Sequence, residues 1–573
     1  MHASDAVNWS EWNSRVLKKA KQENKPIFLT IGYFSCYWCH VLQRESFNNK
    51  EIAAVLNKKY ISVVVDRELH PSLDAKMIRF AEQTIGRGGW PLNVVITPDG
   101  YPFMATIYLP SEKFQAWLTQ VNELWATDPE YIRSIARDAA NELNFNMAQK
   151  QSALENKQLK KIIALFRNEL LEAFDEMEGG FGDSAKFPLS RILQIALKVY
   201  SHSPEQSLKE NIQLTLKNMF ERGMYDHLGD GFFRYTTDPG WHIPHFEKML
   251  YDNAQLASLY FKAGKLFEDP EYIEIGKKIL DFMLSKFRAT NGGFYSSFSA
   301  VDGEGIEGGY YVWDKKSWQR LLTEEEQKVV SIVWGWSNPP VIDEGHLPVF
   351  AIDKDIATKQ TKYSMAKVEE LISSSKVKLL GDRNNRELPL DKKQLASWNA
   401  LALLALVEGF EATGLKQYKA AAEKLSLFIS QELIVNNKLQ RSVHQGKFAG
   451  NADLEDHALV ALAFNRWSSK FPSKRLKQQS EQLMDYAWAH FFSEKGWKMS
   501  DDLLIPYGSS DSMLADGPLP SASGILINLG LGSSSKALND KAKTALQYGH
   551  NILLNQPFWY ASHVSLLMGL VEQ

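Results

Sequence analysis

The chain contains very little cysteine and no long apolar run. Its 573 residues include two cysteines, Cys36 and Cys39, three positions apart. So few cysteines exclude a secreted fold held together by several disulfides, and they confine all thiol chemistry to one place. The longest apolar runs, such as residues 401–407, are far shorter than the roughly 20 residues that cross a bilayer. We therefore expect no membrane insertion.

An excess of charge is also lacking. The 65 Lys and Arg residues nearly balance the 68 Asp and Glu residues, which leaves a net charge of −3. Because there is no basic stripe, we expect no nucleic-acid partner. Residues 1–10 show no signal peptide, which predicts a cytoplasmic protein. The abrupt start leaves one alternative open, a periplasmic protein whose export signal has been trimmed.

The length of the chain exceeds what one hydrophobic core can hold, so at least two domains are expected. In residues 1–112, short apolar and β-branched runs at 26–33, 61–65, 92–97 and 101–109 alternate with helical patterns at 36–47, 51–58 and 73–85. This alternation is typical of an α/β domain with a mostly parallel sheet. Pro98-Asp99-Gly100 predicts a turn between the last two strands.

Beyond residue 112 the strand pattern fades and helical periodicity takes over. We expect a helical linker over residues 113–155 and an all-helical domain over residues 156–573, with short helices between 315 and 373. About twelve long helices are predicted, at residues 157–174, 191–200, 208–222, 251–266, 271–287, 395–411, 417–430, 454–467, 475–492, 521–531, 541–551 and 559–571.

A short glycine-rich motif recurs between these helices. It contains Phe181, Phe232 and Phe294 in turn, each directly after a glycine, and a weaker copy contains Trp497. The first two intervals are 51 and 62 residues, and self-similarity at such a period indicates repeated helical hairpins. About six hairpins in a ring would form an (α/α)6 toroid whose loops meet at one mouth. An irregular helical bundle or an open solenoid is the alternative.

The two cysteines open a predicted helix directly after a predicted strand. Backbone N–H groups at the start of a helix favour a thiolate, so this arrangement indicates a redox dithiol in a thioredoxin-like domain. Cys36 would be the exposed nucleophile and Cys39 the resolving thiol, with Trp38 and His40 as neighbouring candidates. Pro91 follows a Gly-Gly-Trp loop and opens a strand, where thioredoxin-like folds place a cis-proline facing the dithiol. The fold class is therefore multidomain, α/β plus all-α.

Other chemistry at the same motif was weighed. Cys36 to His40 also matches the attachment pattern of c-type haem, but the surrounding strand and helix favour the redox fold. A zinc site lacks an obvious fourth ligand. We therefore expect no cofactor and no metal. An inert dithiol that serves only as a scaffold is the remaining alternative.

Polar residues in the Gly- and Pro-rich loops predict a second site at the mouth of the toroid. In a glycoside hydrolase, Glu247 would pair with Asp302, Glu304 or Asp456 as acid and base or nucleophile. In an epimerase, His245 and His457 would move protons α to a carbonyl. A buried network that ties loops to helix ends is the structural alternative. The candidate pocket residues are His227, Trp241, His245, Glu247, Lys248, Asp252, Asp302, Glu307, Trp398, Asn399, Asp456 and His457.

Nine segments resemble one family in order and spacing. They are residues 25–28, 36–40, 45–47, 65–68, 88–93, 186–188, 244–252, 307–313 and 397–399. The chain is identified as a member of the family that includes spermatogenesis-associated protein 20. The resemblance implies a thioredoxin-like domain fused to a six-hairpin toroid similar to N-acylglucosamine epimerases and toroidal glycosidases. It implies no settled reaction. The sequence departs from the family at residues 66–71 and 520–524 and at His457, where Tyr is common.

We therefore expect a thiol–disulfide oxidoreductase that acts on a disulfide-bearing protein or a small thiol, fused to a toroid of unknown substrate. One alternative is a carbohydrate-active enzyme, either a glycoside hydrolase or a sugar epimerase, with a regulatory redox domain. The other is a binding protein in which both sites are inert. A carbohydrate is the ligand class expected for the toroid.

Overall fold

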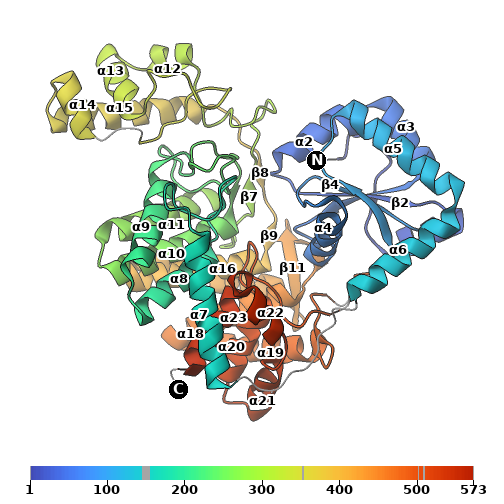
Figure 1. Ribbon diagram of the computed structural model, residues 1–573. Coiled ribbons are helices and arrows are strands. Elements are labelled where there is room, and N and C mark those ends of the chain that lie inside the picture. Colours follow the sequence, from blue (N-terminus) through green and yellow to red (C-terminus); the bar gives the residue numbers. More distant parts are fainter. Residues whose placement is uncertain (1, 145–154, 351–353, 501–502, 507–509, 572–573) are drawn as a thin grey trace.

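The computed structural model describes residues 2–144, 155–350, 354–500, 503–506 and 510–571. A thioredoxin-like domain, in blue, lies beside a ring of helices, and an inserted group of helices extends from the far side of the ring (Figure 1). In the described residues no helix is both long enough and apolar enough to span a bilayer.

The N-terminal domain is built on a five-stranded sheet. The strands are β1 (Ser10–Glu11), β2 (Ile27–Gly32), β3 (Ile61–Asp66), β4 (Leu92–Ile96) and β5 (Pro102–Thr106), in the order β1-β3-β2-β4-β5. β1, β3 and β2 run parallel, whereas β4 is antiparallel to both its neighbours. The expected mostly parallel sheet is therefore mixed, because the turn at Gly100 sends β5 straight back along β4.

Successive side chains of the strands point to opposite faces of the sheet and contribute to two separate hydrophobic cores. Ile27 and Leu29 pack beneath α1 (Ser14–Glu23) and α4 (Pro71–Ile85). Phe28 faces the opposite side, which α3 (Lys50–Lys59) and α5 (Ser111–Thr127) cover. This is the period-two alternation expected of a sheet buried on both faces.

The expected helical linker over residues 113–155 differs in the structure. Most of α5 and all of α6 (Pro129–Asn144) occupy its first part, and Phe114 and Trp117 of α5 share a core with Phe28. Ala140 of α6 joins the core on the other face of the sheet. These helices therefore complete the N-terminal domain, because without them one sheet face would stay exposed. Residues 145–154 of the expected linker lie outside the described residues.

The helical part is a closed ring. In the described part of the chain six inner helices each pack against the next, and the last packs back against the first. Closure confirms the (α/α)6 toroid and excludes an open solenoid. The inner helices are α8 (Ser190–His202), α10 (Leu250–Phe267), α16 (Ala396–Thr413), α18 (Leu454–Lys470), α20 (Ala522–Leu531) and α23 (Ala561–Val571). The outer helices are α7 (Asn156–Ala173), α9 (Gln206–Glu221), α11 (Pro270–Phe282), α17 (Lys416–Phe428), α19 (Lys474–His490) and α21 (Lys536–Ala545).

An inserted subdomain carries its own tryptophan-rich core. Trp313, Trp318, Trp334 and Trp336 pack together within it. Its helices are α12 (Lys315–Leu321), α13 (Glu324–Val333), α14 (Lys354–Thr361) and α15 (Met365–Arg383). The helix expected at 541–551 is divided: α21 ends at Ala545, and Gly549, with φ of 79°, is the N-cap from which α22 (His550–Asn555) begins.

Short elements at the helix ends complete the fold. Turns with π-helical bonding, η1 (Gln43–Phe47), η2 (Met283–Phe287) and η3 (Ile429–Leu433), extend α2 (Tyr37–Leu42), α11 and α17, and a 3-10 turn, η4 (Pro557–Tyr560), precedes α23. The toroid loops contain β6 (Lys248–Met249), β7 (Ser297–Phe298), β8 (Leu390–Asp391), β9 (Gln394–Leu395), β10 (Ile434–Val435), β11 (Lys438–His444), β12 (Lys447–Asn451), β13 (Phe492–Ser493) and β14 (Gly496–Trp497).

The repeated glycine-rich motif is a repeated backbone structure. The same turn bond joins Asp175 N to the Gly180 carbonyl at 2.9 Å and Asp226 N to the Gly231 carbonyl at 3.1 Å. In two repeats, the side chain of an asparagine on an inner helix hydrogen-bonds both backbone groups of the motif's phenylalanine. Asn399 accepts from the Phe294 N–H at 2.7 Å and donates to the Phe294 carbonyl at 3.0 Å. Asn253 makes the equivalent pair of bonds in the preceding repeat.

This pairing predicts that Asn399→Ala destabilises the toroid by about 2–4 kcal/mol, since it leaves two buried backbone groups without partners. The measurement is the urea midpoint of the toroid. Asn551→Ala, at an exposed position of α22, is the matched control and should change stability by less than about 0.5 kcal/mol. Equal urea midpoints for the two variants would show that the hydrogen bonds from Asn399 to Phe294 do not stabilise the toroid.

Candidate functional site

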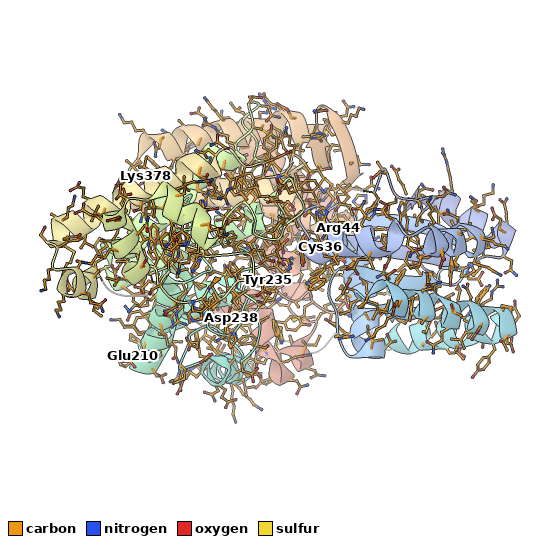
Figure 2. All side chains as sticks on the ribbon, turned by 90° about the horizontal axis from the view of Figure 1, so that it is seen from above. Cys36, Arg44, Glu210, Tyr235, Asp238 and Lys378 are labelled. Carbon is orange, nitrogen blue, oxygen red and sulfur yellow. A yellow bond between two sulfur atoms is a disulfide. The ribbon has the colours of Figure 1, made fainter. Side chains whose placement is uncertain are left out.

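The dithiol lies at the start of a helix and against the toroid. Cys36 is the N-cap of α2, its Sγ accepts from the Cys39 N–H at 3.2 Å, and the two cysteines form a disulfide. Cys36 is 3% exposed and Cys39 is 4% exposed. The expectation that Cys36 is exposed is therefore wrong, because the toroid covers it. Figure 2 shows Cys36 and Arg44 where the blue N-terminal domain meets the rest of the molecule.

A cis bond joins Trp90 and Pro91, as the sequence analysis expected. Pro91 and Cys39 line the same cavity of about 260 Å³, together with Asp66 and Lys393. Trp38, inside the dithiol motif, is 41% exposed and packs against a tyrosine ring. His40 Nε2 lies 2.9 Å from a backbone carbonyl, and burial lowers the pKa of its imidazole.

Glu247 joins the two domains through one buried carboxylate. It accepts from the Tyr33 hydroxyl at 2.9 Å and the Ser35 hydroxyl at 3.2 Å, both next to the dithiol. From the toroid it accepts from Arg234 Nη1 at 3.0 Å, and Arg234 also donates to the Tyr33 hydroxyl. A backbone bond from Ala300 N to the Ser35 carbonyl, at 3.1 Å, adds to the same contact.

Two arginines, one from each domain, stack on the tryptophan beside the cis-proline. The Arg67 guanidinium lies 3.9 Å from the Trp90 ring centroid, and the Arg234 guanidinium lies 5.4 Å from it. Asp74 fixes the stack, because it accepts from Trp90 Nε1 at 2.8 Å and lies 3.5 Å from Arg67 Nε. Flat guanidinium groups suit this stacking better than an ammonium group would.

Polar contacts at residues 66–68 also join the two domains along their contact surface, which we call the seam. Lys393 of the toroid pairs with Asp66 and, at 2.9 Å, with Glu68 of the N-terminal domain. Arg441 donates to the Glu68 carbonyl at 2.6 Å and to Asp456 at 2.7 Å.

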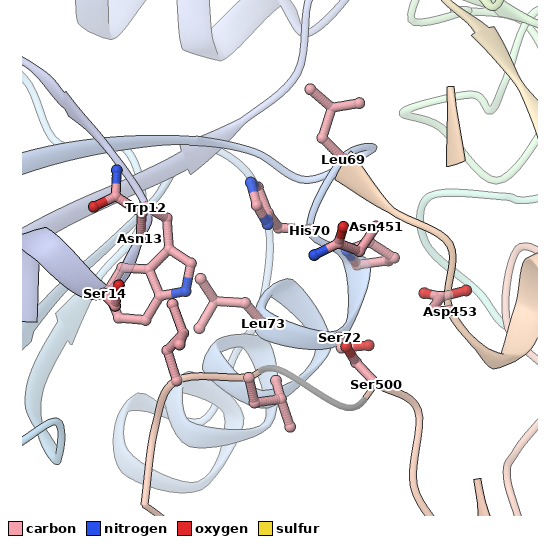
Figure 3. A pocket seen from close by; sticks show the side chains of 13 residues that line it. Trp12, Asn13, Ser14, Leu69, His70, Ser72, Leu73, Asn451, Asp453 and Ser500 are labelled. Carbon is pink, nitrogen blue, oxygen red and sulfur yellow. The ribbon is translucent and has the colours of Figure 1, made fainter. Parts of the chain in front are cut away.

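A further hollow of about 300 Å³ lies along this seam. Figure 3 shows Trp12 and His70 of the N-terminal domain facing Asn451 and Asp453 of the toroid across it. The domains are therefore in contact over an extended surface that encloses small spaces.

Acidic groups with raised pKa values gather at the mouth of the toroid, near the stacked arginines. Burial raises the pKa of Asp252 to about 8, against the opposing effect of Arg234. Burial also raises the pKa of Glu455 to about 7. The Tyr251 ring packs edge-on against Trp398 at 4.7 Å. Among the described residues, Tyr251 OH and Asp252 Oδ2 have no well-formed hydrogen bond.

Another acidic group lies beside the dithiol motif. Glu307 Oε1 is 3.5 Å from His245 Nδ1, and His245 packs against Tyr37 of the motif. Burial raises the pKa of Glu307 to about 8, and the carboxylates of Glu344 and Glu247 add to that rise. The structure thus brings six of the predicted toroid residues to the seam or the mouth: His245, Glu247, Asp252, Glu307, Trp398 and Asp456.

The other predicted toroid residues bond mainly to loops and helix ends. His227 Nε2 lies 3.1 Å from a backbone carbonyl, and burial lowers its pKa to about 3. Trp241 is fully buried, and its Nε1 donates to a carbonyl at 3.0 Å. Asp302 accepts from two backbone N–H groups of its own loop, each at 2.9 Å.

Lys248, Asn399 and His457 form structural contacts away from the seam, whereas Asp456 is bonded within it. Lys248 Nζ donates to Asp226 at 2.7 Å, and Asn399 holds the repeated motif. Asp456 pairs with Arg441, and His457 Nδ1 lies 2.7 Å from the carbonyl of residue 453. In the described ranges no group of three or more His, Cys, Asp or Glu side chains has metal-binding geometry.

Five further residues at the site were not predicted from the sequence: Tyr33, Arg67, Trp90, Arg234 and Tyr251. Two of them had a usable signal, because Trp90 precedes the suspected cis-proline and Tyr251 directly precedes Asp252. Arg234 had none, because its partner Tyr33 lies 201 positions away in the sequence.

Known proteins resemble this chain over different spans. The family model Thioredox_DsbH, described as a protein of unknown function, DUF255, matches residues 1–144. Among solved structures, the chain is similar to a D-mannose isomerase, at 12% identity over 68% of this chain and 83% of that chain, with a TM-score of 0.45. It is also similar to a DsbH oxidoreductase, at 18% identity over 21% of this chain and 85% of that one, with a TM-score of 0.18.

Curated relatives match most of the chain. Spermatogenesis-associated protein 20 is 32% identical in Mus musculus, over 80% of this chain and 64% of that protein, and 34% identical in Homo sapiens, over 72% and 57%. The match thus spans less than two thirds of either mammalian protein. An uncharacterized protein of Caenorhabditis elegans is 31% identical over 81% of this chain and 67% of that protein. The chain therefore belongs to the family of spermatogenesis-associated protein 20.

Proposed function

We propose that Cys36 and Cys39 form a reversible thiol–disulfide redox centre whose substrates are small thiols and disulfides. The observation that carries this proposal is the disulfide at the start of α2, beside the cis-proline, with Cys36 only 3% exposed. A thiol at that position is favoured as a thiolate, because α2 and η1 form one continuous helical segment and the Cys39 N–H near its start donates to the Cys36 sulfur at 3.2 Å.

The reaction requires only the two thiols and a substrate disulfide. The Cys36 thiolate attacks one sulfur of the substrate, forms a mixed disulfide and releases one substrate thiol. The Cys39 thiolate then attacks the Cys36 sulfur, closes the internal disulfide and releases the second thiol. Two electrons pass from the dithiol to the substrate, and a small thiol reductant regenerates the dithiol by the reverse steps.

Size limits the substrate because the toroid covers the dithiol. The carbonyl and hydroxyl of Ser35 and the hydroxyl of Tyr33 are all bonded to toroid groups. A folded protein substrate would need the whole seam to separate. The cavity of about 260 Å³ that reaches Cys39 supports access by a small molecule.

The proposal predicts that the reduced protein reduces oxidised glutathione faster than it reduces insulin. Cys36→Ser should lower the rate to the uncatalysed background, because the attacking thiolate is gone. Cys39→Ser should trap glutathione on Cys36, which intact-mass spectrometry detects. Full activity in Cys36→Ser would overturn the redox assignment, whereas faster turnover of insulin than of glutathione would overturn the size limit.

Acid–base chemistry on a small polar ligand, such as a carbohydrate, is the second candidate. It is favoured by Asp252, whose pKa burial raises to about 8, and by the adjacent Tyr251, whose hydroxyl has no well-formed hydrogen bond among the described residues. A protonated carboxyl can act as a general acid, and the half-buried Glu455 supplies a second carboxyl at the same mouth.

The raised pKa of Asp252 gives this candidate a pH signature. The folded protein keeps this proton up to about pH 8, while the unfolded chain loses it near the ordinary value of 3.8. The folded state binds more protons between these values, so this group lowers stability as pH rises through that window. Asp252→Asn should remove the effect and gain at least about 1 kcal/mol relative to wild type between pH 5 and pH 8.

Urea unfolding at the two pH values measures this gain, with Asp485→Asn, at an exposed position of α19, as the control. An Asp252→Asn variant that tracks the wild type at both pH values would show that Asp252 is ionised in the fold. It would then be unable to serve as the acid.

A further inference from the structure

A cavity of about 230 Å³ lies between the ring and the inserted subdomain, away from the dithiol. Its charged lining consists of Lys248, Lys286, Arg383, Arg386 and the single carboxylate Asp226. Phe282 and Tyr310 add aromatic faces to the same wall. The space is smaller than the roughly 300–1,000 Å³ of sites that hold drug-sized molecules, so an occupant must be small.

Positive charge exceeds negative charge in this cavity, although Arg386 is already paired with Asp382 at 2.7 Å. Asp226 accepts from Lys248 Nζ at 2.7 Å and from Arg383 Nη1 at 2.9 Å, so one buried carboxylate faces two buried cations. The nearby Asp230 carboxyl is bonded to the Tyr225 hydroxyl at 2.7 Å. Burial lowers the pKa of Lys248 to about 8, and the neighbouring Arg383 adds to that fall while Asp226 and Asp230 oppose it. An anion would relieve that excess.

Two buried hydrogen-bond donors of the cavity wall are unpaired. Arg383 is 3% exposed and Tyr311 is 1% exposed. Within the described part of the chain, neither Arg383 Nε nor the Tyr311 hydroxyl has a hydrogen-bond partner. Leaving such groups unpaired costs free energy, and a guanidinium with a free edge suits a planar or tetrahedral oxyanion. The Arg383 guanidinium lies directly against the backbone of Gly229. A side chain at position 229 would prevent this, since its Cβ would lie 1.9 Å from Arg383 Nη2.

We propose that this cavity is a binding site for phosphate carried by a small molecule, namely a phosphomonoester of a ring compound the size of a hexose. Arg383 and Tyr311 would donate to the phosphate oxygens, and Lys286 at the exposed rim would attract the anion. The rings of Phe282 and Tyr310 would contact the rest of the ligand. The site is separate from the dithiol and does not depend on the redox proposal.

The test is calorimetric titration of the full chain with inorganic phosphate and with glucose 6-phosphate, at constant ionic strength because surface charges are screened by salt. Both probes should bind, and glucose 6-phosphate should bind more tightly because it also contacts the rings. Tyr311→Phe removes only the unpaired hydroxyl, and Lys286→Gln changes only an exposed side chain. Each variant should weaken binding by about tenfold, the loss of one bond to a charged group.

Two matched controls separate binding from folding. Tyr60→Phe removes another buried hydroxyl, in the N-terminal domain, that has no hydrogen-bond partner among the described residues, and Lys477→Gln removes an exposed charge on α19. Both should keep the wild-type affinity for phosphate. Tighter binding of inorganic phosphate than of glucose 6-phosphate would overturn the ring-compound assignment. No binding of either probe up to about 10 mM, or wild-type affinity in both Tyr311→Phe and Lys286→Gln, would overturn the site.

Discussion

The buried carboxylate of Glu247 is the interaction on which the relation between the two domains depends. It accepts hydrogen bonds from Tyr33 and Ser35 of one domain and from Arg234 of the other, and it is fully buried. Removing one partner from a buried ion pair costs about 3–5 kcal/mol, because the remaining charge has no solvent to stabilise it. Separating the domains would strip Glu247 of its two hydroxyl partners and expose the arginine stack on Trp90.

The same contact determines what each domain can do. It places the dithiol, which in its own domain would face solvent, against the mouth of a helical ring. It also brings Arg67 and Trp90 from the N-terminal domain to the acidic residues of the toroid mouth, including Asp252 and Glu455. Neither domain alone contains this arrangement. The chemistry of the mouth and the reactivity of Cys36 therefore depend on the contact between the two domains.

Local patterns were sufficient to predict the separate domains. Short apolar runs between helical patterns predicted β2, β3 and β4. The spacing of the glycine-rich motifs predicted the helical hairpins, whose motifs are bonded to Asn253 and Asn399. The placement of α5 was missed, because its apolar face resembles that of any amphipathic helix until the sheet is present. The burial of Cys36 was missed for a deeper reason: it depends on Glu247, more than 200 residues later in the chain, and no local pattern encodes that meeting.

The rate at which a maleimide attached to a long polyethylene glycol chain alkylates Cys36 in the reduced, native protein tests the sealed dithiol most directly. The same measurement on the urea-unfolded chain gives the rate for an open thiol. A sealed seam predicts that the native rate is at least about tenfold lower, because so large a reagent reaches the sulfur only when the domain contact opens. A native rate equal to or above the unfolded rate would show that Cys36 is open to solvent, and the sealed arrangement would then be wrong.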